Sequence, residues 1–202
     1  MRIKLVPFAA ALAIAALALA QPAAAQGPEK GDVSFGYQFL NLSADSDSES
    51  LPAGWFVDLA GNLTKSLAVV AQVGGNYKSY EQSASFGGAS ASANASLKLY
   101  EFMGGVRMSS RANRTVVPFA HVLAGAAYGS GSFEATGSFG GQNLALSGAD
   151  SQTNFAFQAG GGTNIGMTEK VGIRFGVDYI RIFETDGGVN AFRLGAGVNL
   201  KF

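Results

Sequence analysis

The chain contains no cysteine, and only 14% of its 202 residues are charged. Without cysteine there can be no disulfide, so the core or the backbone hydrogen-bond ladder must hold the fold together. Basic and acidic residues are equal in number, at 14 each, so no basic excess points to nucleic acid. Beyond residue 26 no apolar run approaches the ~20 residues of a membrane-spanning helix, which excludes a helical membrane protein.

The first 25 residues have the order of a secretory signal peptide. Arg2 and Lys4 precede an apolar run rich in alanine and leucine, and Ala23–Ala25 supply the small residues of a cleavage site. The run is short for a membrane anchor. We expect cleavage after Ala25, which leaves 26–202 as one domain with a slight acidic excess.

Glycine, with 28 residues, and alternating apolar and polar positions are what the chain has in abundance. The last segment is the clearest case, because every even position from Phe192 to Phe202 is apolar. Period-two alternation is the signature of a strand with one apolar face. A water-soluble sheet rarely finishes on an exposed apolar strand, whereas the closing strand of a bacterial outer-membrane barrel faces lipid.

The same alternation recurs along the chain and predicts eight strands. Their ranges are 32–39, 55–60, 67–77, 100–107, 118–128, 154–160, 171–179 and 192–202. The short connections are 64–66, 109–114 and 166–170, and the longer ones are 43–54, 79–96, 129–153 and 184–190. Bacterial barrels have short periplasmic turns and longer outer loops, so the longer set should face outward. The predicted fold is all-β, an eight-stranded antiparallel up-and-down transmembrane β-barrel.

On the apolar face, each predicted strand has an aromatic residue near its long-connection end. The eight are Phe39, Trp55, Tyr77, Tyr100, Tyr128, Phe155, Tyr179 and Phe192. Aromatic side chains collect at membrane interfaces because the ring is apolar while its tip can stay wet. We therefore expect an aromatic girdle.

The opposite face carries charged side chains that would point into the barrel. An eight-stranded barrel is just wide enough for side chains to fill, and buried unpaired charges are costly, so these residues should pair. The predicted polar network of the lumen is Asp58, Glu101, Arg107, His121, Arg174, Asp178 and Arg193. A plugged lumen and a narrow pore both remain open, because no motif encodes gating.

His121, the only histidine, is a candidate for catalysis. A hydrolase needs a nucleophile, a base and an orienting acid within reach of one another, and no serine lies two residues from His121. We therefore expect no catalytic residue and no enzyme activity. The carboxylates of Asp45, Asp47 and Glu49 alternate, but no glycine turn or closing glutamate completes a calcium loop. A solvated loop, without metal or cofactor, is the expectation there.

Two of the longer connections contain a Gly-Gly pair, Gly87-Gly88 and Gly140-Gly141, midway between polar–apolar runs. That arrangement is a hairpin signal, so the strands could continue beyond the membrane as β-ribbons. Flexible polar loops are the alternative. An exposed ribbon edge could add a strand from a partner.

The leader, the alternating segments, glycine-rich strand centres such as 122–128 and the terminal Phe202 resemble the small outer-membrane β-barrel proteins. That group includes the OmpX-like proteins and the membrane part of the OmpA-like proteins, and the resemblance covers nearly all of 30–202. It implies the outer membrane of a Gram-negative-type bacterium, contact with outer-membrane lipid and lipopolysaccharide, and insertion by the barrel-assembly machinery. In that family the closing strand is read by this machinery, which would make Val198, Leu200 and Phe202 an insertion signal.

These patterns predict a non-enzymatic outer-membrane protein that acts as a structural or surface-interaction module. Its outer loops would be displayed to an extracellular partner. The alternative function is a small passive channel, or a carrier for small or apolar molecules. We expect a monomer without a nucleic-acid partner.

Overall fold

The structure is a computed structural model that describes residues 30–202, except for 45–46, 87–88, 114, 140–141 and 185–186. The expected signal peptide lies outside the described residues. Within them, no helix is long and apolar enough to cross a membrane.

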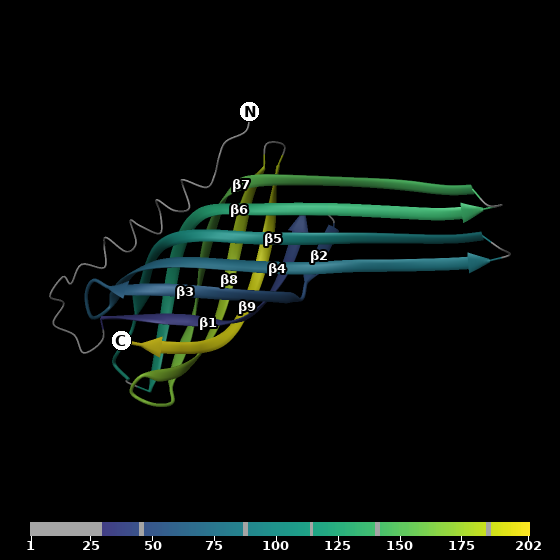
Figure 1. The fold of residues 1–202 in the computed structure, drawn as a ribbon. Helices are drawn as coiled ribbons and strands as arrows, with labels where there is room; N and C mark the ends of the chain where they lie inside the picture. The colour runs from purple at the N-terminus through teal and green to yellow at the C-terminus, as the bar shows by residue number, and fades with distance from the viewer. Residues whose placement is uncertain (1–29, 45–46, 87–88, 114, 140–141, 185–186) are drawn as a thin grey trace.

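The described part of the chain forms nine strands (Figure 1). They are β1 (Gly31–Ala44), β2 (Asp47–Leu51), β3 (Ala53–Asn62), β4 (Leu67–Phe86), β5 (Ala89–Ser109), β6 (Val116–Phe139), β7 (Gln142–Gly166), β8 (Val171–Glu184) and β9 (Gly187–Lys201).

All neighbouring strands pair antiparallel, and the sheet closes into a ring between β1 and β9. The closing pairs run from Asp32 to Ser43 along β1. At one end, Gly31 and Phe202 exchange backbone hydrogen bonds with N···O distances of 3.1 and 3.0 Å. A closed ring leaves no unpaired edge in the wall, which is the condition for a sheet in hydrocarbon. The predicted barrel is confirmed.

β3 corresponds to the second predicted strand, 55–60, and β2 precedes it within 43–54, which was predicted as a connection. Both pair with β1, with Leu51 of β2 opposite Leu40 and Trp55 of β3 opposite Tyr37. Pro52 lies between them. Because proline has no N–H to give to the ladder, the strand is interrupted there.

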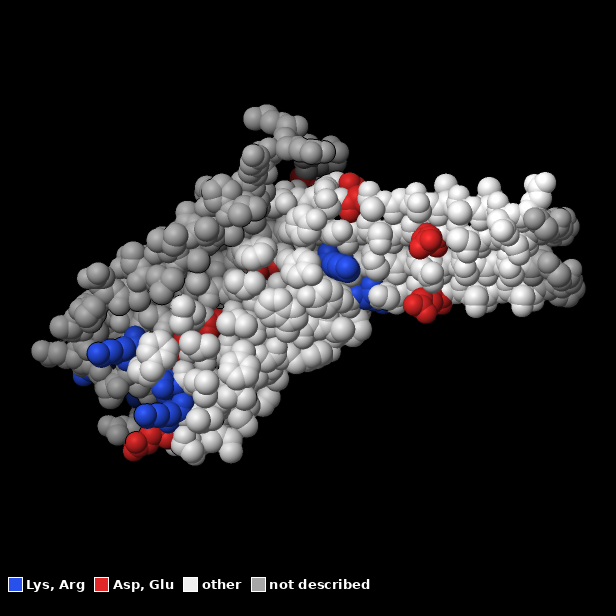
Figure 2. Space-filling view, viewed as in Figure 1, with Lys and Arg blue, Asp and Glu red and all other residues white. Residues whose placement is uncertain are grey.

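The alternation seen in the sequence separates the two faces of the wall. Apolar side chains such as Phe35, Phe175 and Leu194 are exposed on the outside. Figure 2 shows that the visible side of this wall is largely free of charged residues. Charged side chains lie inside the ring instead. An apolar exterior around a polar interior is the inverse of a water-soluble protein and suits contact with lipid.

Glycines allow neighbouring strands to approach closely at the strand centres. A Cβ atom placed on Gly162 of β7 would lie 1.9 Å from the carbonyl oxygen of Phe175, and one on Gly125 of β6 would lie 1.9 Å from that of Phe102. A side chain at either position would force the strands apart. These glycines permit the strongly curved wall visible in Figure 1.

Four strands run well past the ring. β6 has 24 residues and β7 has 25, and Figure 1 shows β4 to β7 projecting together as one flat sheet. Pairing continues to Phe86↔Ala89 between β4 and β5, and to Phe139↔Gln142 between β6 and β7. We name this sheet the extension, and it comprises residues 78–86, 89–98, 129–139 and 142–154. The ribbon interpretation of the long connections is confirmed and the loop interpretation is wrong; the Gly-Gly pairs themselves lie outside the described residues.

Candidate functional site

The seven side chains predicted for the lumen network all lie inside the ring, and none is more than 5% exposed. They fall into two clusters, each organised around arginine. The clusters are stacked along the lumen, one nearer the extension and one nearer the end with the short turns.

Arg193 of β9 is the centre of the cluster nearer the extension. Its Nη2 donates to Asp178 Oδ2 at 2.7 Å and to Gln72 Oε1 at 3.0 Å, and its Nη1 donates to Glu101 Oε2 at 3.2 Å. His121 Nε2 lies 2.5 Å from the other oxygen of Asp178. Charge-assisted hydrogen bonds of this kind are the strong ones in proteins. A single guanidinium group therefore joins strands from opposite parts of the wall.

Arg107 of β5 organises the second cluster. It donates to both carboxylate oxygens of Asp58, one of them at 2.6 Å, and to Asp32 Oδ1 at 3.2 Å. Arg174 Nη1 lies 3.6 Å from Asp58 Oδ1, and its guanidinium carbon lies 4.1 Å from the centre of the Phe119 ring. Asp32 was not part of the predicted network, although its position in the alternating segment 32–39 already placed it on the inner face.

An apolar group fills the lumen at the end nearer the extension. It consists of buried side chains that include Leu40, Leu51, Leu99, Ile180 and Ile182. This group was not predicted from the sequence, because its members lie outside the predicted strands. Leu40 and Ile180 follow the predicted ends at 39 and 179, and Leu99 precedes the predicted start at 100. The signal was present, since these residues continue the inward parity of their strands. The lumen is thus packed with both polar and apolar side chains, and this group adds an apolar layer at the end nearer the extension.

His121 has no nucleophile among its hydrogen-bond partners. Its Nε2 contacts the carboxylate of Asp178 and, at 3.1 Å, the side-chain amide of Gln158. The imidazole is buried in the lumen, away from lipid and from the extension. In this arrangement the ring serves as one member of the Arg193 cluster.

The eight predicted girdle aromatics all lie on the outer face of the wall. Trp55 Nε1 donates to Tyr77 Oη at 3.0 Å. The Tyr77 and Tyr100 rings are 5.7 Å apart and those of Tyr100 and Tyr128 are 6.4 Å apart, measured between centroids. A continuous aromatic band therefore crosses β3 to β6 directly below the extension, which is where an interface would put it.

Val198, Leu200 and Phe202 lie exposed on the same outer face, along the closing strand β9. Their recognition by assembly machinery stays a prediction.

Glu49 fastens β2 to the base of β4. Lys78 Nζ donates to Glu49 Oε1 at 2.5 Å, and the Tyr80 hydroxyl donates to the same oxygen. The hydrogen bond from Lys78 holds the pKa of Glu49 below its ordinary value, and the same bond raises the pKa of Lys78. The solvated-loop interpretation is wrong for residues 47–51, which form β2; Asp45 lies outside the described residues. No group of three or more potential metal ligands occurs in the described part of the chain.

The outer edges of the extension have no neighbouring strand in the described structure. β3 stops pairing with β4 at Tyr77, and β8 stops pairing with β7 at Phe155. At the end of β7, the N–H of Gly166 donates to the carbonyl of Thr115, the residue that precedes β6. Because the β6–β7 ladder is uninterrupted, all even-numbered residues of β7 direct their backbone N–H and C=O groups to β6. Odd-numbered residues of β7 therefore direct their N–H and C=O groups to the free edge.

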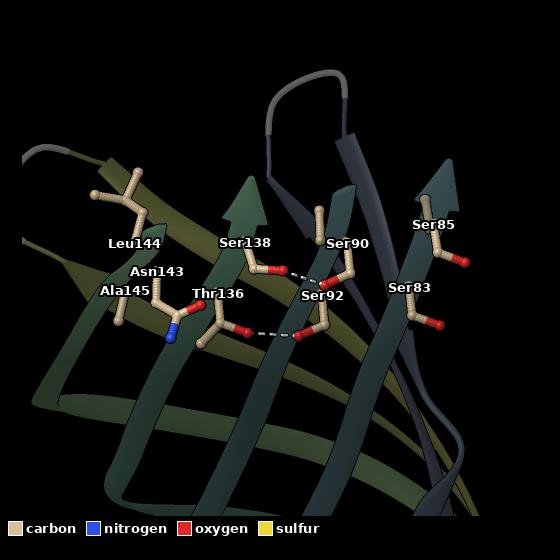
Figure 3. A pocket seen from close by; sticks show the side chains of 12 residues that line it. Ser83, Ser85, Ser90, Ser92, Thr136, Ser138, Asn143, Leu144 and Ala145 are labelled. Carbon is tan, nitrogen blue, oxygen red and sulfur yellow. Dashed lines mark hydrogen bonds between the residues drawn. The ribbon is translucent and has the colours of Figure 1, made fainter. Parts of the chain in front are cut away.

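The two faces of the extension differ in chemistry. The face continuous with the outer wall is rich in hydroxyl groups, and pairs such as Ser90–Ser138 and Ser92–Thr136 hydrogen-bond across β5 and β6 at 2.8 and 2.7 Å (Figure 3). These hydroxyls line a shallow depression of about 590 Å³. The opposite face is rich in alanine and glycine and also carries exposed apolar side chains, which include Leu97, Phe133, Leu144 and Leu146.

A closed antiparallel ring with an apolar exterior and a charged interior defines a transmembrane β-barrel of the outer-membrane type. The sequence confirms this class at the level of the family. The chain belongs to the outer membrane protein beta-barrel domain family, whose model matches residues 9–202.

Several solved structures are similar to this chain. Ail, the attachment invasion locus protein of Yersinia pestis, is 20% identical with a TM-score of 0.58, over 85% of this chain and 99% of that one. The structure of Ail with the heparin analogue sucrose octasulfate gives a TM-score of 0.56 at the same identity and coverage. Neisserial surface protein A is 14% identical with a TM-score of 0.54, over 87% and 99% of the two chains. At these identities the likeness concerns the fold. Among curated protein sequences, none matches the chain.

Proposed function

We propose that this outer-membrane protein is a non-enzymatic surface-interaction module. It projects the extension from the cell surface and receives an extended segment of a partner protein at a free strand edge. The observation that carries the proposal is the unpaired outer edge of β7 over residues 142–154. A row of unpaired backbone N–H and C=O groups is a template on which another strand can add.

The two edges of the extension are not equally open. The β4 edge begins beside the contact of Lys78 and Tyr80 with Glu49 of β2, and it carries Glu81. Natural sheets use charge and covering contacts of this kind to block strand addition. The β7 edge is longer and has a single charged residue, Asp150. The β7 edge is therefore the better docking position.

The packing of the lumen supports an interaction module over a channel. Arg193 and Arg107 each bridge carboxylates across the interior, and apolar side chains that include Leu40 and Ile180 fill one end. An ion passing this lumen would have to displace paired charges and cross an apolar layer, both of which are costly.

The charge of the extension also bears on the class of partner. Its charged side chains are Lys78, Glu81, Lys98, Glu134 and Asp150. Sulfated glycans are held by clusters of arginine and lysine. Acidic residues outnumber basic ones here, so a protein segment suits this surface better than a sulfated glycan.

Removing the extension tests the proposal. In the trimmed variant, short turns replace residues 79–96 and 130–152. Bacteria that display the full chain should adhere to cultured cells, and bacteria with the trimmed chain should not. Folded barrel, followed by its heat-dependent gel mobility, should be equal in the two strains. Equal adhesion would refute the proposal, and channel conductance of the purified full chain in planar bilayers would favour the transport alternative.

A further inference from the structure

The free edge of β7 contains a short segment that is symmetric in chemical type. Residues 143–147 read Asn-Leu-Ala-Leu-Ser, so a polar residue and a leucine lie on each side of Ala145. Leu144 is 77% exposed and Leu146 is 62% exposed, and both lie on the alanine- and glycine-rich face of the extension. No charged residue occurs between 142 and 149.

Because of this symmetry, the segment can pair with an identical copy of itself across a two-fold axis. When two identical strands pair antiparallel about an axis perpendicular to the sheet, each residue meets its mirror position in the other copy. Ala145 is odd-numbered, so its backbone N–H and C=O point to the free edge. An axis at Ala145 therefore places the edge-facing N–H and C=O of Ala145 in one copy opposite the same groups in the other copy.

We propose that the β7 edge binds a second copy of this chain, with the two β7 strands antiparallel about Ala145. In this register Leu144 lies opposite the partner's Leu146, and Asn143 lies opposite the partner's Ser147. The leucines then cover each other on one face while polar side chains pair on the other. The proposal rests on the proposed function, because it names one occupant of the same edge.

The register with its axis at Ser147 fits less well. An axis at Ser147 would place Leu144 opposite the partner's Asp150, which pairs an apolar side chain with a charge. With the axis at Ala145 the paired segment is 142–148, and Asp150 stays outside it. The β4 edge has no comparable symmetry and carries Glu81.

The geometry of this pair sets the arrangement of the two membranes. Antiparallel β7 strands place the two barrels at opposite ends of a joined eight-stranded sheet, because both extensions project away from their own ring (Figure 1). The axis perpendicular to the sheet also keeps the hydroxyl faces on one side. Each chain therefore stays monomeric in its own membrane and binds a copy in an apposed membrane, which links neighbouring cells or vesicles.

Single-cysteine variants test the register directly, because the chain has no cysteine of its own. The full chain would be reconstituted in two vesicle populations with different labels, mixed, and oxidised. Residues in a hydrogen-bonded antiparallel pair have Cα atoms about 5.5 Å apart, which is within disulfide reach, so Ala145→Cys should form dimers linking the two labels. The matched control is Ala149→Cys, on the same edge and face, which would face position 141 of the other copy. It should give about tenfold less dimer.

A second pair of variants separates the edge from the fold. Ala145→Pro removes a donor that points to the free edge and leaves the β6–β7 ladder intact, so it should abolish vesicle clustering. The backbone N–H of Ser83 likewise points to the free edge of β4, on the other side of the extension. Ser83→Pro should therefore leave clustering unchanged. Equal dimer yields at 145 and 149, cross-links confined to one label, or clustering that survives Ala145→Pro would each overturn the proposal. If the trimmed chain still lost adhesion to other cells in that case, the proposed function would stand while self-pairing fails.

Discussion

Replacing Arg193 with methionine tests how the lumen is held together. Methionine keeps much of the length and volume of the arginine side chain but removes its charge and donors. Arg193 donates two hydrogen bonds to Asp178, at 2.7 and 3.0 Å, and bonds to Glu101 and Gln72 at 3.2 and 3.0 Å. Without it, two carboxylates remain inside the ring with no guanidinium between them.

The size of the effect follows from what is left behind. Removing one partner of a buried ion pair costs about 3–5 kcal/mol, mainly because the remaining charge is uncompensated. Folded domains have unfolding free energies of about 5–15 kcal/mol, so this change would remove a large part of the total. Adding Glu101→Gln and Asp178→Asn to Arg193→Met should restore much of the loss, because no unpaired charge then remains.

Urea unfolding in lipid vesicles measures the free energy, with the fluorescence of Trp55, the only tryptophan, as the signal. Lys98→Met, on the exposed outer face of β5, is the control for losing a cation and should change little. A loss below about 1 kcal/mol for Arg193→Met would refute the reasoning. It would mean that water solvates Asp178 and Glu101, as in an open lumen.

Two further predictions concern the ends of the barrel. Phe202→Ser should lower assembly into the outer membrane in cells far more than Asn199→Ala. The purified Phe202→Ser chain should still fold into vesicles, because the backbone hydrogen bonds between residues 202 and 31 remain. Equal assembly of the two variants in cells would contradict an insertion signal. Because the pKa of Glu49 is lowered, its contact with Lys78 contributes stability above the ordinary glutamate pKa and loses it as pH falls through the lower folded value. NMR of the chain in nanodiscs should show the loss of the Glu49–Lys78 contact with falling pH in the native chain and no such transition in Glu49→Gln. A native contact that persists unchanged well below the ordinary glutamate pKa would count against this prediction.

Strand faces were predictable from the sequence because a barrel wall separates lipid from lumen at every second residue. Asp58 and Arg107 could be assigned to the interior by parity alone. Their partners could not, because parity gives the direction of a side chain but not its height or its neighbour across the lumen. Arg107 reaches Asp58 and Asp32, and Arg193 reaches Glu101, only through the shear and tilt of the closed ring.

Strand ends were the weak point of the sequence interpretation. Leu40 and Ile180 continue the inward-facing positions of their strands, but they lie one residue beyond the predicted ends at 39 and 179. The interruption between β2 and β3 has a local cause in Pro52, which has no N–H for the ladder. This proline is visible in the sequence, but the alternating pattern does not show that a strand continues on its other side.

The sequence by itself determined the outer-membrane class, the all-β fold and the two faces of each strand, since all three depend on the local alternation of apolar and polar residues. Only the tertiary structure decided that β4 to β7 continue as one sheet, that the lumen is divided between two arginine clusters and an apolar layer, and that Ala145 faces a free edge. Those features depend on which residues from distant segments come to the same height, and that height is fixed by the ring closure of β1 on β9.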